Sequence, residues 1–298
     1  MSNQIRPTTF KDIIGQEEAI KRLKINSMGC KLSNSVMPHV LIDGPPGLGK
    51  TTIAGAIANE LDVEIYNCNA ANLRSVKSIT PYLMGMSPRA VLFIDEIHRL
   101  PKLVEEFLYP VMEDFKMTIA VEETTEEIDI PQFTLIGATT SGGSLSQPFY
   151  DRFTIKEHLN FYSESELAKL ARSNLQKMGL SISDHDMVEI AKRSKGTPRI
   201  LNARLSWYKN YILSVGKDSV DAIFDAQGID KFGMDVYDRL YMEALEKNIG
   251  NPLGLKSISS LTGIAIETIE NSIEPYLVRE GYVIRTQKGR IMGKNKRV

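Results

Sequence analysis

The chain carries a glycine-rich loop near its start, with the sequence Gly44-Pro45-Pro46-Gly47-Leu48-Gly49-Lys50-Thr51. The apolar residues 40–42 before this loop predict a buried strand, and residues 52–61 after it predict a helix. Between a strand and a helix, such a loop points backbone N–H groups at phosphate oxygens, and the helix dipole adds positive charge there. Lys50 would reach the β- and γ-phosphates of a nucleotide, and the Thr51 hydroxyl would ligate Mg²⁺. The pattern is too specific for an ordinary turn and predicts a nucleotide-binding domain.

The composition is that of an ordinary globular protein, with 42% hydrophobic and 24% charged residues in a chain of 298. This length suffices for about two or three domains. No apolar run reaches the length of a membrane span, and the polar start 1–4 lacks the apolar region of a secretory signal. A cytoplasmic protein without a membrane partner is therefore expected, with Cys30 and Cys68 as free thiols. The net charge of −1 argues neither for nor against binding of nucleic acid.

A second apolar run, residues 90–94, ends in the two carboxylates Asp95 and Glu96. The last residues of such a strand lie at the carboxyl edge of a parallel sheet, where open α/β folds bind their ligands. Asp95 can hold Mg²⁺ through water there, and Glu96 can orient and deprotonate an attacking water molecule. Such a pair can also be a helix cap, but the phosphate loop upstream favours the catalytic interpretation, a Walker B signature.

A third apolar run, residues 133–139, is followed by Thr140, which falls where a sensor of the γ-phosphate would lie. A Gly- and Ser-rich loop then leads to Asp151-Arg152-Phe153. Arg152 is either a plain salt-bridge partner or an arginine finger that stabilises charge on the transferring phosphoryl group. The sequence leaves open whether such a finger would act within its own subunit or on a neighbour.

Three smaller features of the first half have more than one interpretation. The apolar pair Ile13-Ile14 can pack against an adenine base or belong to the core. His98 has no cluster of possible ligands around it, so we interpret it as a residue that packs in the core or supports a neighbouring site residue, and not as a metal ligand. Residues 116–129 alternate as in a hairpin and are acidic. The hairpin can be a solvated edge or a docking arm, and its acidic residues are Glu122, Glu123, Glu126, Glu127 and Asp129.

Residues 161–232 predict a small helical lid domain after the first domain, 1–160. Ser163 and Glu166 form a capping box at the start of one helix, and Gly179 ends that helix. Further on, Arg199 lies in the first turn of another helix, where its positive charge opposes the helix dipole. A nucleotide phosphate would supply the missing partner.

Residues 233–298 predict a winged-helix domain, because three short helical patterns precede two strands joined by a glycine-bearing turn. The end of this domain is basic, which suits contacts with the DNA backbone, although a solvated tail would have the same composition. Glu280 is the single acidic residue there. The basic residues are Arg279, Arg285, Lys288, Arg290, Lys294, Lys296 and Arg297.

Together these motifs resemble the RuvB family of Holliday-junction branch-migration motors, within the AAA+ ATPases. The resemblance covers almost the whole chain. It rests on Arg6-Pro7, Ile13-Ile14-Gly15-Gln16, residues 44–52, Leu92-Phe93-Ile94-Asp95-Glu96-Ile97-His98-Arg99-Leu100, residues 104–115 and 134–140, Asp151-Arg152-Phe153, Gly196-Thr197-Pro198-Arg199-Ile200, residues 268–277, and Arg285-Thr286 with Gly289-Arg290.

The resemblance implies a fold, a set of ligands and residue roles. The fold is an α/β AAA+ P-loop NTPase core with a parallel sheet, a helical lid and a C-terminal winged helix. The catalytic residues would be Lys50, Asp95, Glu96, Thr140 as sensor 1, Arg152 as a finger in trans and Arg199 as sensor 2. The cofactors would be ATP and Mg²⁺, the metal held by Thr51 and Asp95. The nucleotide would contact Ile14, Gly44, Pro45, Pro46, Gly47, Leu48, Gly49, Lys50, Thr51, Thr52, Tyr162 and Arg199, with Ile14 and Tyr162 lining the adenine pocket.

The resemblance also implies partners. Family members act as hexameric rings on duplex DNA or four-way junctions together with the junction-binding protein RuvA, and Arg285, Lys288 and Arg290 would contact the DNA here. The chain departs from the family at Ser141, where an arginine is usual, in its short acidic hairpin, and at residues 206–210, where arginines are usual. These departures suit a divergent member of a phage or mobile element that uses another partner or none. An AAA+ loader of a replicative helicase or clamp is the alternative, and a nucleotide-gated DNA-binding regulator is a third class.

Overall fold

The computed structural model describes residues 6–121, 124–140 and 142–294. The chain divides into two compact units. The first holds the residues up to 44 and 48–160, and the second holds 45–47 and 161–298. Within the described ranges, no helix is long and apolar enough to cross a membrane.

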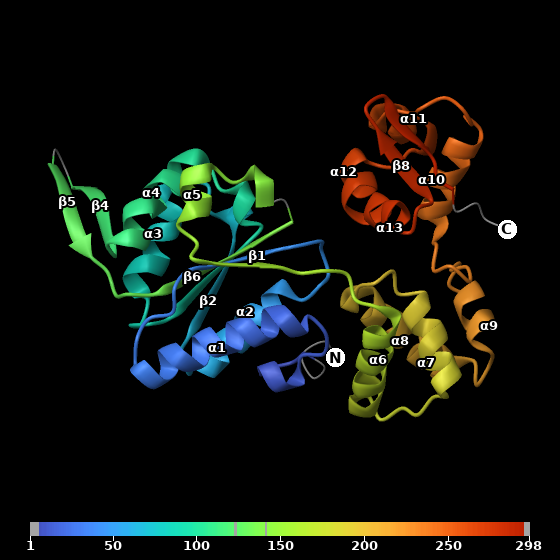
Figure 1. The fold of residues 1–298 in the computed structure, drawn as a ribbon, viewed down its shortest axis with the longest axis horizontal. Coiled ribbons are helices and arrows are strands. Elements are labelled where there is room, and N and C mark those ends of the chain that lie inside the picture. The colour runs from blue at the N-terminus through green and yellow to red at the C-terminus, as the bar shows by residue number, and fades with distance from the viewer. Residues whose placement is uncertain (1–5, 122–123, 141, 295–298) are drawn as a thin grey trace. The chain divides into compact units, whose positions relative to one another are not determined.

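The first unit is built on a parallel sheet of five strands in the order β2-β3-β6-β1-β7. Helices α1 and α2 cover one face of this sheet, and α3 and α4 cover the other (Figure 1). The strands are β1 Val40–Asp43, β2 Ile65–Asn69, β3 Val91–Asp95, β6 Thr134–Thr139 and β7 Ile155–His158. The α-helices are α1 Glu17–Ser33, α2 Lys50–Leu61, α3 Val76–Gly85, α4 Lys102–Glu113 and α5 Gln147–Asp151. Short 3₁₀ turns are η2 Phe10–Asp12, η3 Ala70–Asn72, η4 Ile97–Arg99 and η5 Gly142–Ser144.

The three central strands are the three apolar runs of the sequence. Strands β1, β3 and β6 are buried almost throughout, because helices cover both faces of a parallel sheet. The parallel register brings Asp43 beside Thr139, and Asn69 beside Asp95, so the carboxyl ends of these strands share one edge. The sequence did not predict the two edge strands, β2 and β7, which are less uniformly buried than the central strands and have a mixed composition. It also did not predict the helix α5, which follows the expected Gly- and Ser-rich loop.

The predicted hairpin is present and belongs to the first unit. Strands β4 Lys116–Val121 and β5 Thr124–Asp129 pair in antiparallel fashion, and they project away from the sheet (Figure 1). Lys116 Nζ lies 3.3 Å from Glu127 Oε2 across this pair. The acidic residues Glu122 and Glu123 lie outside the described residues.

The second unit begins with four helices, α6 Glu164–Lys177, α7 Asp184–Lys192, α8 Pro198–Ser214 and α9 Val220–Asp225. The predicted capping box is present, because Ser163 N–H donates to Glu166 Oε2 at 2.8 Å and Glu166 N–H donates to Ser163 Oγ at 3.2 Å. Helix α6 ends just before Gly179, which has a φ of 69°. Arg199 lies in the first turn of α8, as predicted.

The rest of the second unit is a winged helix with its own apolar core. Its elements are α10 Val236–Glu246, α11 Leu255–Thr262, α12 Ile266–Thr268, the π-helical segment η6 Ile269–Ile273, α13 Glu274–Arg279, β8 Val283–Thr286 and β9 Gly289–Met292. We expected one continuous third helix, but it contains a π turn ahead of Pro275. A proline ring cannot donate to the preceding turn and crowds the carbonyl there, and the wider π turn accommodates it.

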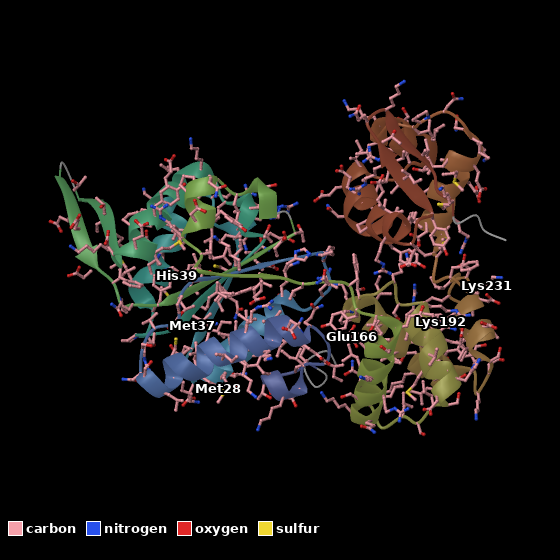
Figure 2. All side chains as sticks on the ribbon, viewed as in Figure 1. Met28, Met37, His39, Glu166, Lys192 and Lys231 are labelled. Carbon is pink, nitrogen blue, oxygen red and sulfur yellow. The ribbon has the colours of Figure 1, made fainter. Side chains whose placement is uncertain are left out.

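His39 is a buried titratable group at the start of β1 (Figure 2). Its Nδ1 accepts the Leu135 N–H at 2.9 Å, so in the neutral ring Nε2 carries the proton and donates to the Met112 carbonyl, also at 2.9 Å. Burial lowers the pKa of His39 below its ordinary value. Protonation would place a hydrogen on Nδ1 directly against the Leu135 N–H.

Acidification is therefore expected to destabilise the first unit through His39. A group whose folded pKa lies below its unfolded pKa contributes stability above the unfolded value, near 6.5, and loses it as the pH falls. The free energy of unfolding should fall by about 1 kcal/mol between pH 7 and pH 5. Thermal melts at both pH values would measure this loss, which should shrink in a His39→Gln variant. His185, whose side chain is 80% exposed, supplies the control His185→Gln, and an equal loss in all three proteins would contradict the prediction.

Candidate nucleotide site and DNA-binding wing

The phosphate loop has the backbone that an anion site requires. Gly47 and Gly49 have φ angles of 84° and 101°, values that side chains rarely permit. At Gly44 a Cβ atom would lie 2.7 Å from the Leu159 carbonyl oxygen, so only glycine fits there. Lys50 opens α2 with only 7% of its surface exposed, and its Nζ donates to the Gly44 carbonyl at 2.7 Å.

These donors fit a nucleotide phosphate, and the oxygen groups nearby fit Mg²⁺. The loop combines backbone N–H groups, a helix N-terminus and one ammonium group, which all favour anions. Thr51 is exposed in the first turn of α2, and Thr52 follows it half-buried. A hydroxyl and a carboxylate such as that of Asp95 are hard oxygen ligands, the kind that Mg²⁺ prefers.

The carboxylate pair lies at the end of β3, as the sequence predicted. Asp95 is its last residue, and Asp95 Oδ1 accepts the Glu96 N–H at 3.1 Å. Glu96 has a φ of 51°, an uncommon value for a residue other than glycine, and such strain is concentrated at functional sites. Thr140 Oγ donates to Glu96 Oε2 at 3.2 Å, so the structure brings the predicted sensor to the predicted base.

His98 supports this pair in a way that the sequence did not reveal. Its Nδ1 lies 2.9 Å from Thr139 Oγ and 3.4 Å from Glu96 Oε2. The ring thereby links η4 to the end of β6, and it restricts the position of the Glu96 carboxylate. We expected a residue that packs or supports the site, and the three-dimensional neighbourhood shows that it does the latter, through contacts with Glu96 and Thr139.

A second feature that sequence reasoning missed is the clamp made by Gln16. This residue has a φ of 57° and precedes α1, and its side-chain amide donates to the Asn160 carbonyl at 2.5 Å and accepts the Asn160 N–H at 3.1 Å. The clamp joins two distant segments of the first unit. Ile14, the predicted adenine contact, is half-buried just before it.

Five predicted nucleotide contacts lie in the second unit: Pro45, Pro46, Gly47, Tyr162 and Arg199. Tyr162 is 8% exposed, and its N–H donates to the Gly196 carbonyl at 2.9 Å. Arg199 is exposed, and its backbone N–H donates to the Gly47 carbonyl at 3.3 Å. Among the described residues its guanidinium forms no ion pair, which leaves it available for an anion.

Arg152 follows α5 and is held by groups of the first unit. Its guanidinium lies 4.1 Å from the centre of the Tyr109 ring, 3.2 Å from Glu113 Oε1 and 2.6 Å from the Pro148 carbonyl, to which it donates. None of these three groups belongs to the phosphate loop or to β3. The structure therefore does not join Arg152 to the other candidate catalytic residues of its own chain.

Thiol chemistry has no role in this site. Both cysteines are free, as predicted. Burial raises the pKa of the Cys68 thiol to about 12, so it stays protonated and unreactive at neutral pH.

The wing carries less unpaired positive charge than its sequence indicated, because a buried carboxylate pairs with two of its arginines. Glu274, with no exposed surface, accepts from Arg285 Nε and from Arg290 Nε, both at 2.8 Å. Tyr241 donates to the same carboxylate at 2.8 Å, and burial raises the pKa of Tyr241, so it remains a neutral donor. The sequence reading counted only Glu280 against the arginines and missed Glu274, because that residue comes earlier in the chain.

Lys288 lies exposed in the turn between the wing strands. The wing is fixed at its base, because Leu253 and Arg290 exchange backbone hydrogen bonds of 2.9 and 2.8 Å. A Cβ at Gly289 would lie 2.5 Å from the Leu253 carbonyl oxygen, so glycine is required where the strands meet. Lys296 and Arg297 lie outside the described residues.

The parallel sheet carries a phosphate loop and a carboxylate pair at the end of a strand, and a helical lid follows it. This combination defines a P-loop ATPase of the AAA+ class, here with a winged helix attached. Family models support this class along the chain. The model of the Holliday junction DNA helicase RuvB P-loop domain matches residues 5–159, the RuvB AAA lid domain matches 162–235, and the RuvB C-terminal winged helix domain matches 231–296. The chain belongs to the RuvB family.

Individual relatives agree with the family models. The chain is 39% identical over 297 residues to a Holliday junction branch migration complex subunit RuvB of Rhodopirellula baltica, covering 96% of this chain and 81% of the relative. The solved structure of the Thermotoga maritima RuvB Holliday junction branch migration motor is 37% identical, covers 98% of this chain and 96% of that chain, and superposes with a TM-score of 0.90. A singly substituted variant of the Thermotoga protein gives the same TM-score of 0.90, with 36% identity and coverage of 97% of this chain and 96% of that chain.

Proposed function

We propose that this protein is an ATP-driven motor that moves duplex DNA and migrates four-way junctions. The observation that carries the proposal is the presence of a phosphate loop, a strand-end carboxylate pair and a winged helix in one chain that matches RuvB relatives along nearly its whole length. An AAA+ loader would share the nucleotide site and the basic wing, but the names of these relatives do not favour it.

In this proposal the residues of the first unit bind and hydrolyse ATP with Mg²⁺. The metal ion would neutralise charge on the phosphates, held by Thr51 and Asp95. Lys50 would bind the phosphates, and Glu96 would take the proton of the attacking water. The Thr140 hydroxyl and the His98 ring both contact the Glu96 carboxylate, which supports a role for both in orienting that carboxylate.

The remaining site residues extend the proposal to the second unit and to neighbouring subunits. Arg199 would sense the nucleotide through its exposed guanidinium, and Tyr162 would line the adenine pocket with Ile14. Arg152 would act in trans in a hexameric ring, which its contacts with Tyr109, Glu113 and Pro148, all outside the loop, support. The domain boundaries that we propose are 1–160 for the ATPase domain, 161–232 for the lid and 233–298 for the winged helix.

The DNA-binding residues of the proposal are Arg285, Lys288 and Arg290. Glu274 neutralises one of the two arginine charges and fixes both guanidinium groups, which reduces the entropy that they lose on contact with a phosphate. Lys288 at the tip of the wing adds a mobile charge. A cytoplasmic location accords with action on DNA, and a RuvA-like protein is the proposed partner, since the Rhodopirellula baltica relative is named as a subunit of a branch migration complex. The short acidic hairpin is either its docking arm or a solvated edge.

The test is ATP-driven migration of a synthetic four-way junction by the protein alone and with an added RuvA. We expect junction migration that depends on ATP hydrolysis, together with an ATPase rate that rises when duplex DNA is added. Migration only with RuvA would assign the docking role to the hairpin. DNA-stimulated hydrolysis without migration in either condition would contradict the motor and favour the loader.

A further inference from the structure

Lys195 is a buried lysine that the proposed nucleotide chemistry does not use. It lies between α7 and α8 with its side chain only 5% exposed. Its φ is 50°, and the next residue, Gly196, has a φ of 73°. A left-handed backbone is adopted more easily by glycine or asparagine than by lysine. Such a conformation persists only where the surrounding contacts offset its cost, and those of the Lys195 side chain do so here.

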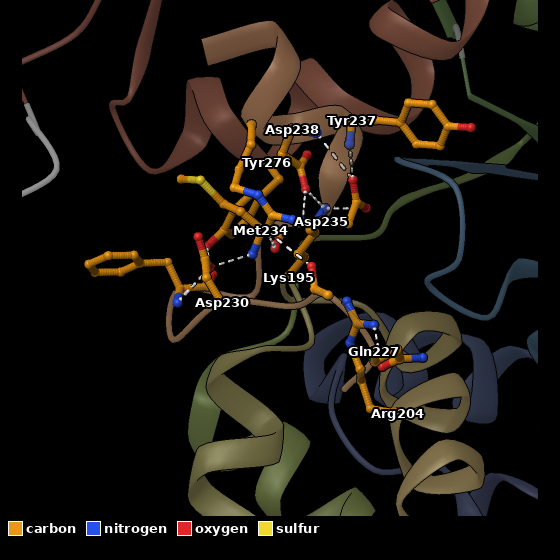
Figure 3. A network of polar contacts seen from close by, with 12 residues as sticks. Lys195, Arg204, Gln227, Asp230, Met234, Asp235, Tyr237, Asp238 and Tyr276 are labelled. Atoms are coloured by element: carbon orange, nitrogen blue, oxygen red, sulfur yellow. Dashed lines mark hydrogen bonds and ion pairs between the residues drawn. The ribbon is translucent and has the colours of Figure 1, made fainter. Parts of the chain in front are cut away.

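That side chain reaches the first turn of α10, the first helix of the winged-helix part (Figure 3). Lys195 Nζ lies 3.3 Å from Asp235 Oδ2 and forms a shorter ion pair with Asp238. Both carboxylates are also bound by the helix, because Asp235 accepts the Tyr237 N–H at 2.8 Å and Asp238 accepts the Asp235 N–H at 2.8 Å. The helix therefore holds both carboxylates in place independently of the lysine.

Lys195 and Asp238 are buried from water, whereas the side chain of Asp235 is 37% exposed. Burial raises the pKa of the Asp238 carboxyl, whose side chain is 1% exposed. Burial also opposes ionisation of Asp235, but Lys195 and the backbone N–H groups outweigh it, and the pKa of Asp235 lies below its ordinary value. Buried ion pairs of this kind contribute more to one specific arrangement than to stability.

Close backbone packing accompanies the ion pairs. A Cβ at Gly233 would lie 2.7 Å from the Arg193 carbonyl oxygen, and a Cβ at Gly196 would collide with the guanidinium of Arg279. That guanidinium lies 4.4 Å from the centre of the Phe161 ring and donates to the Lys195 carbonyl at 3.4 Å. Residues on both sides of Lys195 are thus in contact with the segment around α10 and α13.

The position of Lys195 in the chain connects this cluster to the helix that carries Arg199. Thr197 caps α8 directly after it, and Arg199 follows in the first turn of that helix. We infer that the ion pairs of Lys195 are a rigid connection, called the joint below, which makes the start of α8 and the winged helix move as one body. Lys195 thereby transmits a nucleotide-dependent movement of Arg199 to the DNA-binding wing, an inference that rests on the proposed function. Lys195 is a positioning residue, since it contacts no reacting group.

The first arm of the test measures the joint without using any activity. In full-length protein whose Cys30 and Cys68 are replaced by serine, spin labels are attached at Lys169→Cys on α6 and Ser257→Cys on α11, two exposed positions. A narrow distance distribution is expected, and Lys195→Met should broaden it. An unchanged distribution would overturn the joint whatever the protein does with DNA.

The second arm measures transmission in the unlabelled protein. Lys195→Met is expected to lower the stimulation of ATPase by duplex DNA by about fivefold or more, the range of typical coupling between sites. The ATPase rate without DNA and the affinity for DNA should both stay at wild-type values. Normal stimulation beside a broadened distribution would overturn transmission. If the wild type shows no stimulation, the proposed function fails, and the spin labels alone decide the joint.

Two further variants control the design. Lys192→Met removes a lysine of α7 whose Nζ lies 2.8 Å from Glu189 Oε1 within the same helix, and it should behave as wild type in both arms. Asp235→Asn keeps a good helix cap while removing one charge from Lys195, so it preserves folding if Lys195→Met does not. It should change both readouts in the same direction by a smaller amount, and no change in either would overturn the inference.

Discussion

Replacing Glu96 with glutamine is expected to lower the rate of ATP hydrolysis by about a hundred- to ten-thousandfold, the usual contribution of a general base. An amide cannot take the proton of the attacking water, although it can keep the hydrogen bond from Thr140 that the carboxylate now accepts at 3.2 Å. Nucleotide affinity should stay close to that of the wild type, because the phosphate-binding groups lie in residues 44–51. Single-turnover hydrolysis and binding of a fluorescent nucleotide would measure the two effects separately.

The matched control for this variant is Glu106→Gln. Glu106 lies on α4 with half of its side chain exposed and pairs with Lys102 at 3.6 Å, so losing its charge should leave hydrolysis unchanged. Full activity in the Glu96→Gln variant would show that another group activates the water. Parallel losses in both variants would point to damaged folding rather than to a lost base.

The second large effect is expected from Arg152→Ala, which should reduce hydrolysis by roughly a thousandfold or more, as for other arginine fingers. Nucleotide binding should persist, since the guanidinium is held by Tyr109, Glu113 and Pro148 and not by the phosphate loop. If the finger serves a neighbouring subunit, mixing Arg152→Ala with an inactive Lys50→Ala variant restores some activity. In one of the two possible neighbour orders, a mixed interface would then combine an intact loop with an intact finger, whereas the other order would combine both substitutions.

The mixing experiment separates the two locations of the finger. Activity that stays absent at every ratio would assign Arg152 to the site of its own chain, against the trans role. Arg172→Ala is the control, because Arg172 is an exposed arginine of α6 that pairs only at the surface with Asp184, at 2.7 Å. Thermal melts of both variants would show whether the groups around Arg152 still pack without it.

Much of the fold could be read from local patterns. The loop at 44–51, the three apolar runs, the capping box at Ser163 and the glycine turn of the wing depend on neighbours within a few residues. Spacing alone therefore predicted the strand ends and helix starts at which Lys50, Asp95 and Arg199 now lie. The chemical roles of these residues remain predictions, which the variants above address.

The weakly patterned elements were missed for a physical reason. Strands β2 and β7 lie at the sheet edges, where half-exposed positions tolerate polar residues, and β7 reads Ile-Lys-Glu-His. The Glu157 carboxylate in that strand is buried only because Arg22 of α1 donates to it at 2.6 and 2.9 Å. No periodic pattern within β7 encodes that partner.

The sequence by itself determined the class of fold, the family and the types of residue available for chemistry, because those follow from order and spacing along the chain. Only the tertiary structure decided which polar and charged side chains meet: His98 beside Glu96, Glu274 between Arg285 and Arg290, and Lys195 against Asp238. The partners of Lys195 lie about forty residues along the chain, beyond the range of any helical or strand period. Burial then makes such pairs specific, since a charge removed from water must meet a fixed partner.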